Sequence, residues 1–211
     1  METGNIIAVY NDDKRIALNE FDALMRKTND YMNKIATLSD RFRGCDAKQL
    51  EKETLAAIRE QCTNTSFNPS DIELVSGQRF PDIVAGQHFG VEVKSTKENK
   101  WVSTGSSIVE STRVDDVGSI YMLFGKLGGI PAEFRCKPYQ NCLYDIAVTH
   151  SPRYLIDMNV SPENTIFSKM ALINDEFRLS ENQIRHRAQL LQEQDEGKRA
   201  KAMPWWMGVI S

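Results

Sequence analysis

Residues 79–95 read Arg-Phe-Pro-Asp-Ile-Val-Ala-Gly-Gln-His-Phe-Gly-Val-Glu-Val-Lys-Ser, and they combine the pattern of two short strands with charged side chains that a strand pair ordinarily excludes. After Gln87, apolar residues alternate with Gly90, Glu92 and Lys94, which is the period-two pattern of a half-buried strand. Before the turn, Ile83 begins a shorter apolar run, and the Gly-Gln-His sequence between the two runs is typical of a turn. The stretch therefore predicts a β-hairpin centred on Gln87.

The expected register brings two carboxylates face to face. Asp82 lies five residues before Gln87 and Glu92 lies five residues after it. Opposed residues of an antiparallel pair hold their Cβ atoms only about 4.5–5.5 Å apart, so two negative charges there repel each other. A divalent cation between them would remove the repulsion, and Mg²⁺ often takes one or two carboxylates together with waters and substrate phosphates. Lys94 projects from the same strand face as Glu92 and can position a water or stabilise developing negative charge, so the residues indicate metal-assisted hydrolysis of a phosphodiester.

Pro81-Asp82, followed after nine residues by Glu92-Val93-Lys94, resembles the PD-(D/E)xK nucleases, the fold of most type II restriction endonucleases. The resemblance implies an α/β fold with a restriction-endonuclease-like core, in which helices flank a central mixed β-sheet. It implies that Asp82, Glu92 and the main-chain carbonyl of Val93 hold Mg²⁺. It implies further that Lys94 orients or activates the water that cleaves double-stranded DNA.

The same resemblance extends loosely to residues 119–129 and 143–158, which are similar to strands that follow the catalytic hairpin in some restriction enzymes. It also implies a prokaryotic cytoplasmic protein. Because cutting both strands of a palindrome favours two-fold symmetry, we expect a homodimer. Two rival interpretations stay open: a repair, recombination or transposon nuclease of the same fold, and a non-catalytic DNA-binding or assembly module. In the second rival, the hairpin is an ordinary surface hairpin whose Glu92 and Lys94 are solvated.

Two helices are expected before the hairpin. Apolar residues at spacings of three and four predict one amphipathic helix over residues 14–43, ended by Gly44, that serves for packing and possible subunit contact. Asp46 then predicts the N-cap of a second helix reaching about Cys62, with Gln49 as its capping-box partner.

The second helix carries an acidic side chain where its apolar side should be. Glu51 lies near the middle of that side and Glu53 toward its flank, and a carboxylate there is unfavourable unless it is paired or bound to metal. Some nucleases of the resembling family add an acidic residue from a preceding helix, so Glu51 is a candidate further metal ligand and Glu53 the second choice. Alternatively, Glu51 extends to solvent or simply favours the helix N-terminus.

The chain after the hairpin turns polar. Residues 95–107 are rich in hydroxyl groups and predict a loop beside the catalytic strand, which can contact DNA or can be a solvated loop anchored by Trp101. The candidate DNA contacts are Lys97, Lys100, Ser103, Thr104, Arg113 and Arg153. His150 has no partner close in sequence, which favours a structural role over general-base catalysis.

The bulk properties indicate one domain over residues 1–211, with N-terminal helices over about 14–62, a sheet core over about 72–158 and C-terminal helices over about 161–200. At 41% hydrophobic and 26% charged residues, the chain has the composition of a soluble globular protein. The net charge of −3 limits any DNA-binding surface to a local patch. We find no membrane-spanning stretch or signal-peptide pattern. Four scattered cysteines without metal-site spacing favour a reducing cytoplasm, and the apolar end Met203–Ser211 predicts either docking or a chain that continues.

Overall fold

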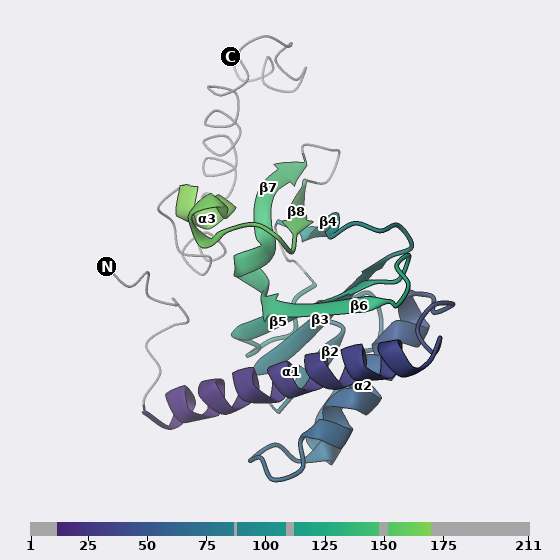
Figure 1. Cartoon of the computed structure of the whole chain (residues 1–211). Coiled ribbons are helices and arrows are strands. Elements are labelled where there is room, and N and C mark those ends of the chain that lie inside the picture. Colours follow the sequence, from purple (N-terminus) through teal and green to yellow (C-terminus); the bar gives the residue numbers. More distant parts are fainter. Residues whose placement is uncertain (1–11, 87, 109–111, 148–151, 170–211) are drawn as a thin grey trace, which may run out of the picture.

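The computed structural model describes residues 12–86, 88–108, 112–147 and 152–169 (Figure 1). The helices of this part are α1 (Asp12–Leu38), α2 (Ala47–Gln61) and the short α3 (Ile166–Lys169). The strands are β1 (Ile72–Leu74), β2 (Ile83–Ala85), β3 (Phe89–Thr96), β4 (Val102–Ser107), β5 (Ser119–Lys126), β6 (Glu133–Pro138), β7 (Leu143–Ala147) and β8 (Arg153–Asp157). Short 3₁₀ turns lie at Pro69–Asp71, Tyr139–Cys142 and Pro162–Asn164.

The central sheet has five strands in the order β1-β2-β3-β5-β6 and is mixed, as predicted. Its central pair, β3 and β5, is parallel, and the other neighbours are antiparallel. The connection from β3 to β5 passes through β4, which belongs to a second, antiparallel sheet of order β4-β8-β7. The segment 72–158, expected to form the sheet core, thus contributes strands to two sheets. In Figure 1 the small sheet lies on one side of the central sheet and α1 and α2 lie on the other.

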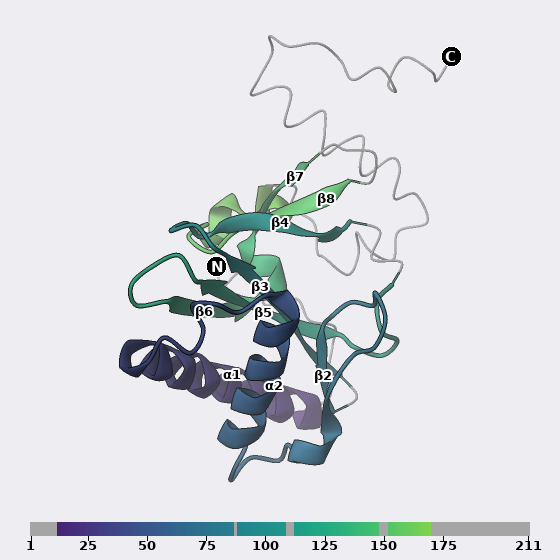
Figure 2. The ribbon, with the colours of Figure 1, turned by 90° about the vertical axis from the view of Figure 1, so that its right-hand side faces the viewer.

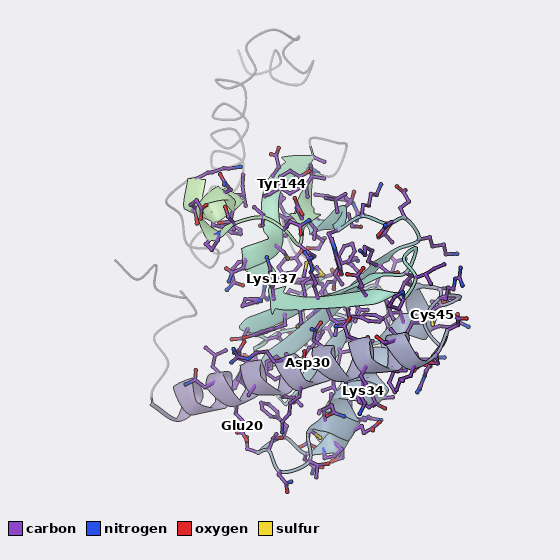
Figure 3. The ribbon with its side chains drawn as sticks, viewed as in Figure 1. Glu20, Asp30, Lys34, Cys45, Lys137 and Tyr144 are labelled. Atoms are coloured by element: carbon purple, nitrogen blue, oxygen red, sulfur yellow. The ribbon has the colours of Figure 1, made fainter. Side chains whose placement is uncertain are left out.

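The helical layer covers one face of the central sheet. Its core joins apolar residues of α1 and α2 to the inward side chains Ile83, Val91, Val93 and Leu123 of the sheet. Charged residues such as Asp30 and Lys34 lie on the exposed side of α1 (Figure 3).

The first helix is shorter than predicted. It ends at Leu38, where both the N–H and the hydroxyl of Ser39 donate to the carbonyl of Ile35. Phe42, part of the apolar pattern, reaches the core from the turn that follows and packs edge-on against Phe134 at 4.8 Å between ring centroids. The pattern thus marked core residues correctly but extended the helix too far.

The second helix begins as predicted. The carboxylate of Asp46 accepts from the N–H of Gln49 at 2.8 Å, and the side chain of Gln49 accepts from the N–H of Asp46 at 2.9 Å. This capping box fixes the start of α2, and with it the direction in which the side chains of its first turns point.

The opposite face of the central sheet packs against the small sheet (Figure 2). Residues 102–107, predicted as loop, form β4. Gly105 permits this packing, because a Cβ there would lie 3.2–3.3 Å from Ile156, Tyr139 and Tyr154. Trp101 is buried, as in the alternative of a loop anchored by this residue, and the guanidinium of Arg135 lies 4.2 Å above its ring. The strand β6 was not predicted.

The remaining predictions for the C-terminal part are only partly covered. The helix expected after Ser161 appears as a 3₁₀ turn followed by the four-residue α3. His150, the expected helix over 180–194 and the apolar end Met203–Ser211 lie outside the described residues.

Candidate functional site

The hairpin has the predicted register. Ile83 pairs with Val91 and Ala85 with Phe89, so the antiparallel alignment continues to Asp82 opposite Glu92. Asp82 itself lies just before the first residue of β2. The register was predictable because it depends only on the turn and on the alternation of the strand after it.

A glycine allows the Pro-Asp segment to lie against β3. A Cβ on Gly90 would lie 2.4 Å from Cγ of Pro81, closer than two carbon atoms can approach. Gly90 has the same strand periodicity as Glu92 and Lys94, so the proline ring packs on the row of side chains that carries the charges. This packing sets Asp82 beside the strand, and sequence reasoning missed it, although a glycine inside a strand pattern often signals such close approach.

Asp82 extends the hairpin with its side chain. Its Oδ2 accepts a hydrogen bond from the main-chain N–H of Val93 at 2.8 Å. The strand β2 begins only at Ile83 and has no residue that pairs with the amide of Val93. The carboxylate of Asp82 therefore accepts the hydrogen bond that a neighbouring strand would otherwise accept. Asp82 is therefore held at the position where it meets Glu92.

The buried Glu92 and the half-buried Lys94 form an ion pair on the sheet face that looks toward the small sheet. Glu92 is 4% exposed, and its Oε1 lies 2.8 Å from Nζ of Lys94. In the parallel register they lie beside Met122 and Phe124 of β5, both buried in the second core. Because Glu92 is buried, its carboxylate is not solvated as the rival hypothesis of a surface hairpin requires, and the ammonium of Lys94 compensates part of its charge.

The electrostatics of the pair are unbalanced. Burial, followed by the charge of Asp82, raises the pKa of Glu92 to about 7, although Lys94 opposes the rise. Burial alone would lower the pKa of Lys94, but Glu92, Asp82 and Glu51 together hold it above its ordinary value. Lys94 is thus a firmly protonated cation surrounded by more than one negative group.

The structure distinguishes between the two helix carboxylates. Glu51 is half-buried; burial and then the charge of Asp82 raise its pKa, while Lys94 opposes the rise. Glu51 therefore lies within electrostatic range of Asp82 and Lys94. Glu53 instead forms an ion pair with Arg41 at 2.6 Å and belongs to the surface between α2 and the turn after α1.

The arrangement suits a hard divalent cation by its chemistry. Asp82, Glu92 and Glu51 supply oxygen atoms, and the single ammonium of Lys94 leaves their charge uncompensated. Among the described residues, however, no three His, Cys, Asp or Glu side chains are arranged to hold a metal ion as they stand. The carboxylate of Asp82 is turned onto an amide and that of Glu92 onto an ammonium, so binding requires both to reorient.

The predicted DNA contacts scatter over several elements. Lys97 and Thr104 are exposed, Ser103 is half-buried, and Lys100 is exposed but pairs with Glu98 at 2.7 Å. Ser103 and Thr104 lie on β4 and not on a loop.

The two predicted arginine contacts have structural partners. Arg113 donates to the carbonyl of Val117 from two nitrogens, at 2.7 and 2.9 Å, and lies over the ring of Phe80. Arg153 is exposed at the start of β8, and its Nη1 lies 3.4 Å from the carbonyl of Gly105. Arg113 thus holds the loop around Phe80 together, and its role as a DNA contact stays a prediction.

No protein-family model matches this chain, and no curated protein is significantly similar to it. Within the described part of the chain, no helix has the length and apolar character needed to cross a membrane.

Proposed function

We propose that this protein is a Mg²⁺-dependent endodeoxyribonuclease, in the manner of a type II restriction enzyme, built on a restriction-endonuclease-like core. The observation that carries the proposal is the meeting of Asp82, Glu92 and Lys94 at the central strand β3 of the mixed sheet. Glu51 of α2 is near enough for the charges of Asp82 and Lys94 to act on its pKa. Acidic and cationic groups of this kind are expected where phosphoryl chemistry is catalysed.

Each residue has a role in phosphodiester hydrolysis. Asp82, Glu92 and the main-chain carbonyl of Val93 would hold Mg²⁺, with Glu51 as a further ligand, and the ion supplies electrostatic stabilisation of the phosphate oxygens. Lys94 positions the attacking water and stabilises the charge that develops on the phosphate. The water oxygen bonds to phosphorus in line with the leaving 3′ oxygen, which takes up a proton, so the products carry a 5′-phosphate and a 3′-hydroxyl.

The substrate is expected to contact the exposed side chains of Lys97, Thr104 and Arg153. Cutting both strands at one palindrome needs two such sites, so the active species is expected to be a homodimer. Light scattering of the purified full chain, with and without DNA, measures that state.

The direct test is cleavage of plasmid and phage DNA by the full chain, with Mg²⁺ and with chelator. Asp82→Asn is the test variant, because the amide oxygen can still accept from Val93 while the charge is lost. Glu53→Gln is the matched control, a helix carboxylate that belongs to a surface ion pair. The proposal expects Mg²⁺-dependent fragments that the control retains and Asp82→Asn loses.

Other results separate the rival functions. Cleavage of branched or damaged DNA, without discrete fragments from plasmid, would favour a repair or recombination nuclease. Equal cleavage by Asp82→Asn and the parent would place the activity elsewhere. If the chain neither cleaves DNA nor binds Mg²⁺ in calorimetry, the nuclease proposal is rejected in favour of a non-catalytic module.

A further inference from the structure

The chain between β1 and β2 forms a loop whose two ends are fixed next to the proposed catalytic carboxylate. The N–H of Val75 donates to the main-chain carbonyl of Asp82 at 2.8 Å, which closes the loop. Phe80 is 4% exposed, its N–H donates to the carbonyl of Thr112 at 3.0 Å, and its carbonyl accepts from Val114 at 2.8 Å. The base of the loop is therefore held by main-chain hydrogen bonds and a buried ring.

The tip of this loop is polar and exposed. Ser76, Gly77, Gln78 and Arg79 are four consecutive exposed residues. Gly77 has a φ of 79°, the left-handed region that favours glycine, so the chain turns there. Within the described residues, neither Gln78 nor Arg79 has a hydrogen-bond or ion-pair partner. The loop thus presents two long side chains that the fold itself does not use.

These two side chains have the chemistry of base recognition. Arginine bonds in a bidentate way to O6 and N7 of guanine, and glutamine to N6 and N7 of adenine, in the major groove. Arg79 is three residues from Asp82, which limits their Cα separation to about 10 Å. With bases rising about 3.4 Å per step along a strand, side chains at that distance reach bases roughly three steps from the phosphate at the site.

We propose that Ser76–Arg79 is a base-reading loop, in which Arg79 recognises a guanine and Gln78 an adenine beside the cleaved phosphodiester. The inference rests on the proposed nuclease function and adds the element that selects its sequence. Alternatively, Arg79 contacts a phosphate, and binding measurements distinguish this contact from a base contact. A phosphate contact would weaken binding to all sequences alike and reduce the salt dependence, whereas a base contact changes the preference at one position.

The test is selection from a randomised double-stranded DNA library by the full chain, with Glu92→Gln as a non-cleaving background. Bound DNA is sequenced for this background alone and with Arg79→Ala or Gln78→Ala added. Arg43→Ala is the matched control, because Arg43 is 53% exposed and lies between α1 and α2 with one long ion pair to Asp40. We expect Arg79→Ala to lose about 5- to 150-fold of a preference for guanine at one position, Gln78→Ala a preference for adenine, and the control to retain both.

Each other outcome overturns the inference. Uniform weakening across sequences with a smaller salt dependence makes Arg79 a phosphate contact, and an unchanged preference removes the loop from recognition. Mg²⁺-dependent cleavage by the parent without any selected sequence rejects this inference alone and leaves a non-specific nuclease. If the parent neither binds nor cleaves DNA, the proposed function and this inference fall together.

Discussion

The two faces of β3 obey different rules, although their residues alternate along one strand. Toward the helices, Phe89, Val91 and Val93 are buried among apolar and aromatic side chains. Toward the small sheet, the same strand carries the buried Glu92 and the half-buried Lys94, whose single positive charge does not balance Glu92 together with Asp82. The first face stabilises the fold, and the second retains charge at the expense of stability. Such a separation is expected where a rigid element positions reactive groups.

The largest expected effect comes from neutralising the charged face. In Glu92→Gln combined with Lys94→Met, the buried pair is replaced by uncharged side chains of similar size, which often leaves stability unchanged or improved. We expect DNA cleavage to fall at least about 10³-fold, since both metal binding and charge stabilisation are removed. Cleavage rate and chemical denaturation, measured on one preparation, check both halves of the expectation. Retained cleavage would show that the charged face does not carry the chemistry.

The apolar face should respond in the opposite way. Val91 has no exposed surface, so Val91→Ala removes two buried methyl groups and leaves a cavity. We expect a loss of about 2–3 kcal/mol in the free energy of unfolding. The cleavage rate per folded molecule should change little, because the residue points away from the charges. A cleavage rate that falls as steeply as in the charged-face variant would mean that the two faces are not separable.

The single change Glu92→Gln tests how much the charge of Glu92 lowers the stability of the fold, when the free energy of unfolding is measured as a function of pH. The pKa of Glu92 is about 7 in the folded chain and about 4.3 when unfolded, so between these values the folded state holds a proton that the unfolded state has lost. In chelator, this group therefore lowers stability as pH rises from about 4.3 to 7, and its full penalty persists above 7. Glu92→Gln lacks that slope and should be more stable than the parent at pH 8, by on the order of 2 kcal/mol, yet not at pH 4.

Mg²⁺ provides the control for that experiment. A bound cation favours the ionised carboxylate, so Mg²⁺ should raise the melting temperature of the parent at pH 8 and leave that of Glu92→Gln nearly unchanged. A parent that is more stable at pH 8 than at pH 5 in chelator would contradict the assigned burial of an uncompensated carboxylate.

Local features of this chain were predictable and distant ones were not. The capping box at Asp46 and the hairpin register around Gln87 involve residues within a few positions of one another, and both were predicted correctly. The strand β4 was mistaken for a loop because the reason for its small residues lies far away in the sequence. Gly105 packs closely against Ile156 and Tyr154, which come about fifty positions later in the chain. Tertiary contact, and not local preference, decides the structure of such a segment.

The choice between Glu51 and Glu53 shows the same limit at the site. Helical spacing placed both near the apolar side of α2, and only Arg41, from the turn after α1, shows which one is neutralised at the surface. Similarly, the alternation of β3 placed Glu92 and Lys94 on one face, but their ion pair and its burial depend on β5 and the small sheet. The pattern therefore predicted the residues of the candidate site without their electrostatic state.

The smallest predicted effect uses this helix pair to test how far the charged face extends. If Glu51 belongs to the site, Glu51→Gln should raise the Mg²⁺ concentration needed for half-maximal cleavage by about 10-fold, as for groups that support a metal centre. Glu53→Gln should leave that concentration unchanged and alter the free energy of unfolding by no more than about 1 kcal/mol, since it breaks a partly exposed ion pair. If Glu51→Gln and the parent need the same Mg²⁺ concentration, the charged face consists of the hairpin residues alone and Glu51 is not part of it. The raised pKa of Glu51 would then reflect only its burial beside a neighbouring site, because proximity to charge shifts a pKa whether or not the group takes part in binding.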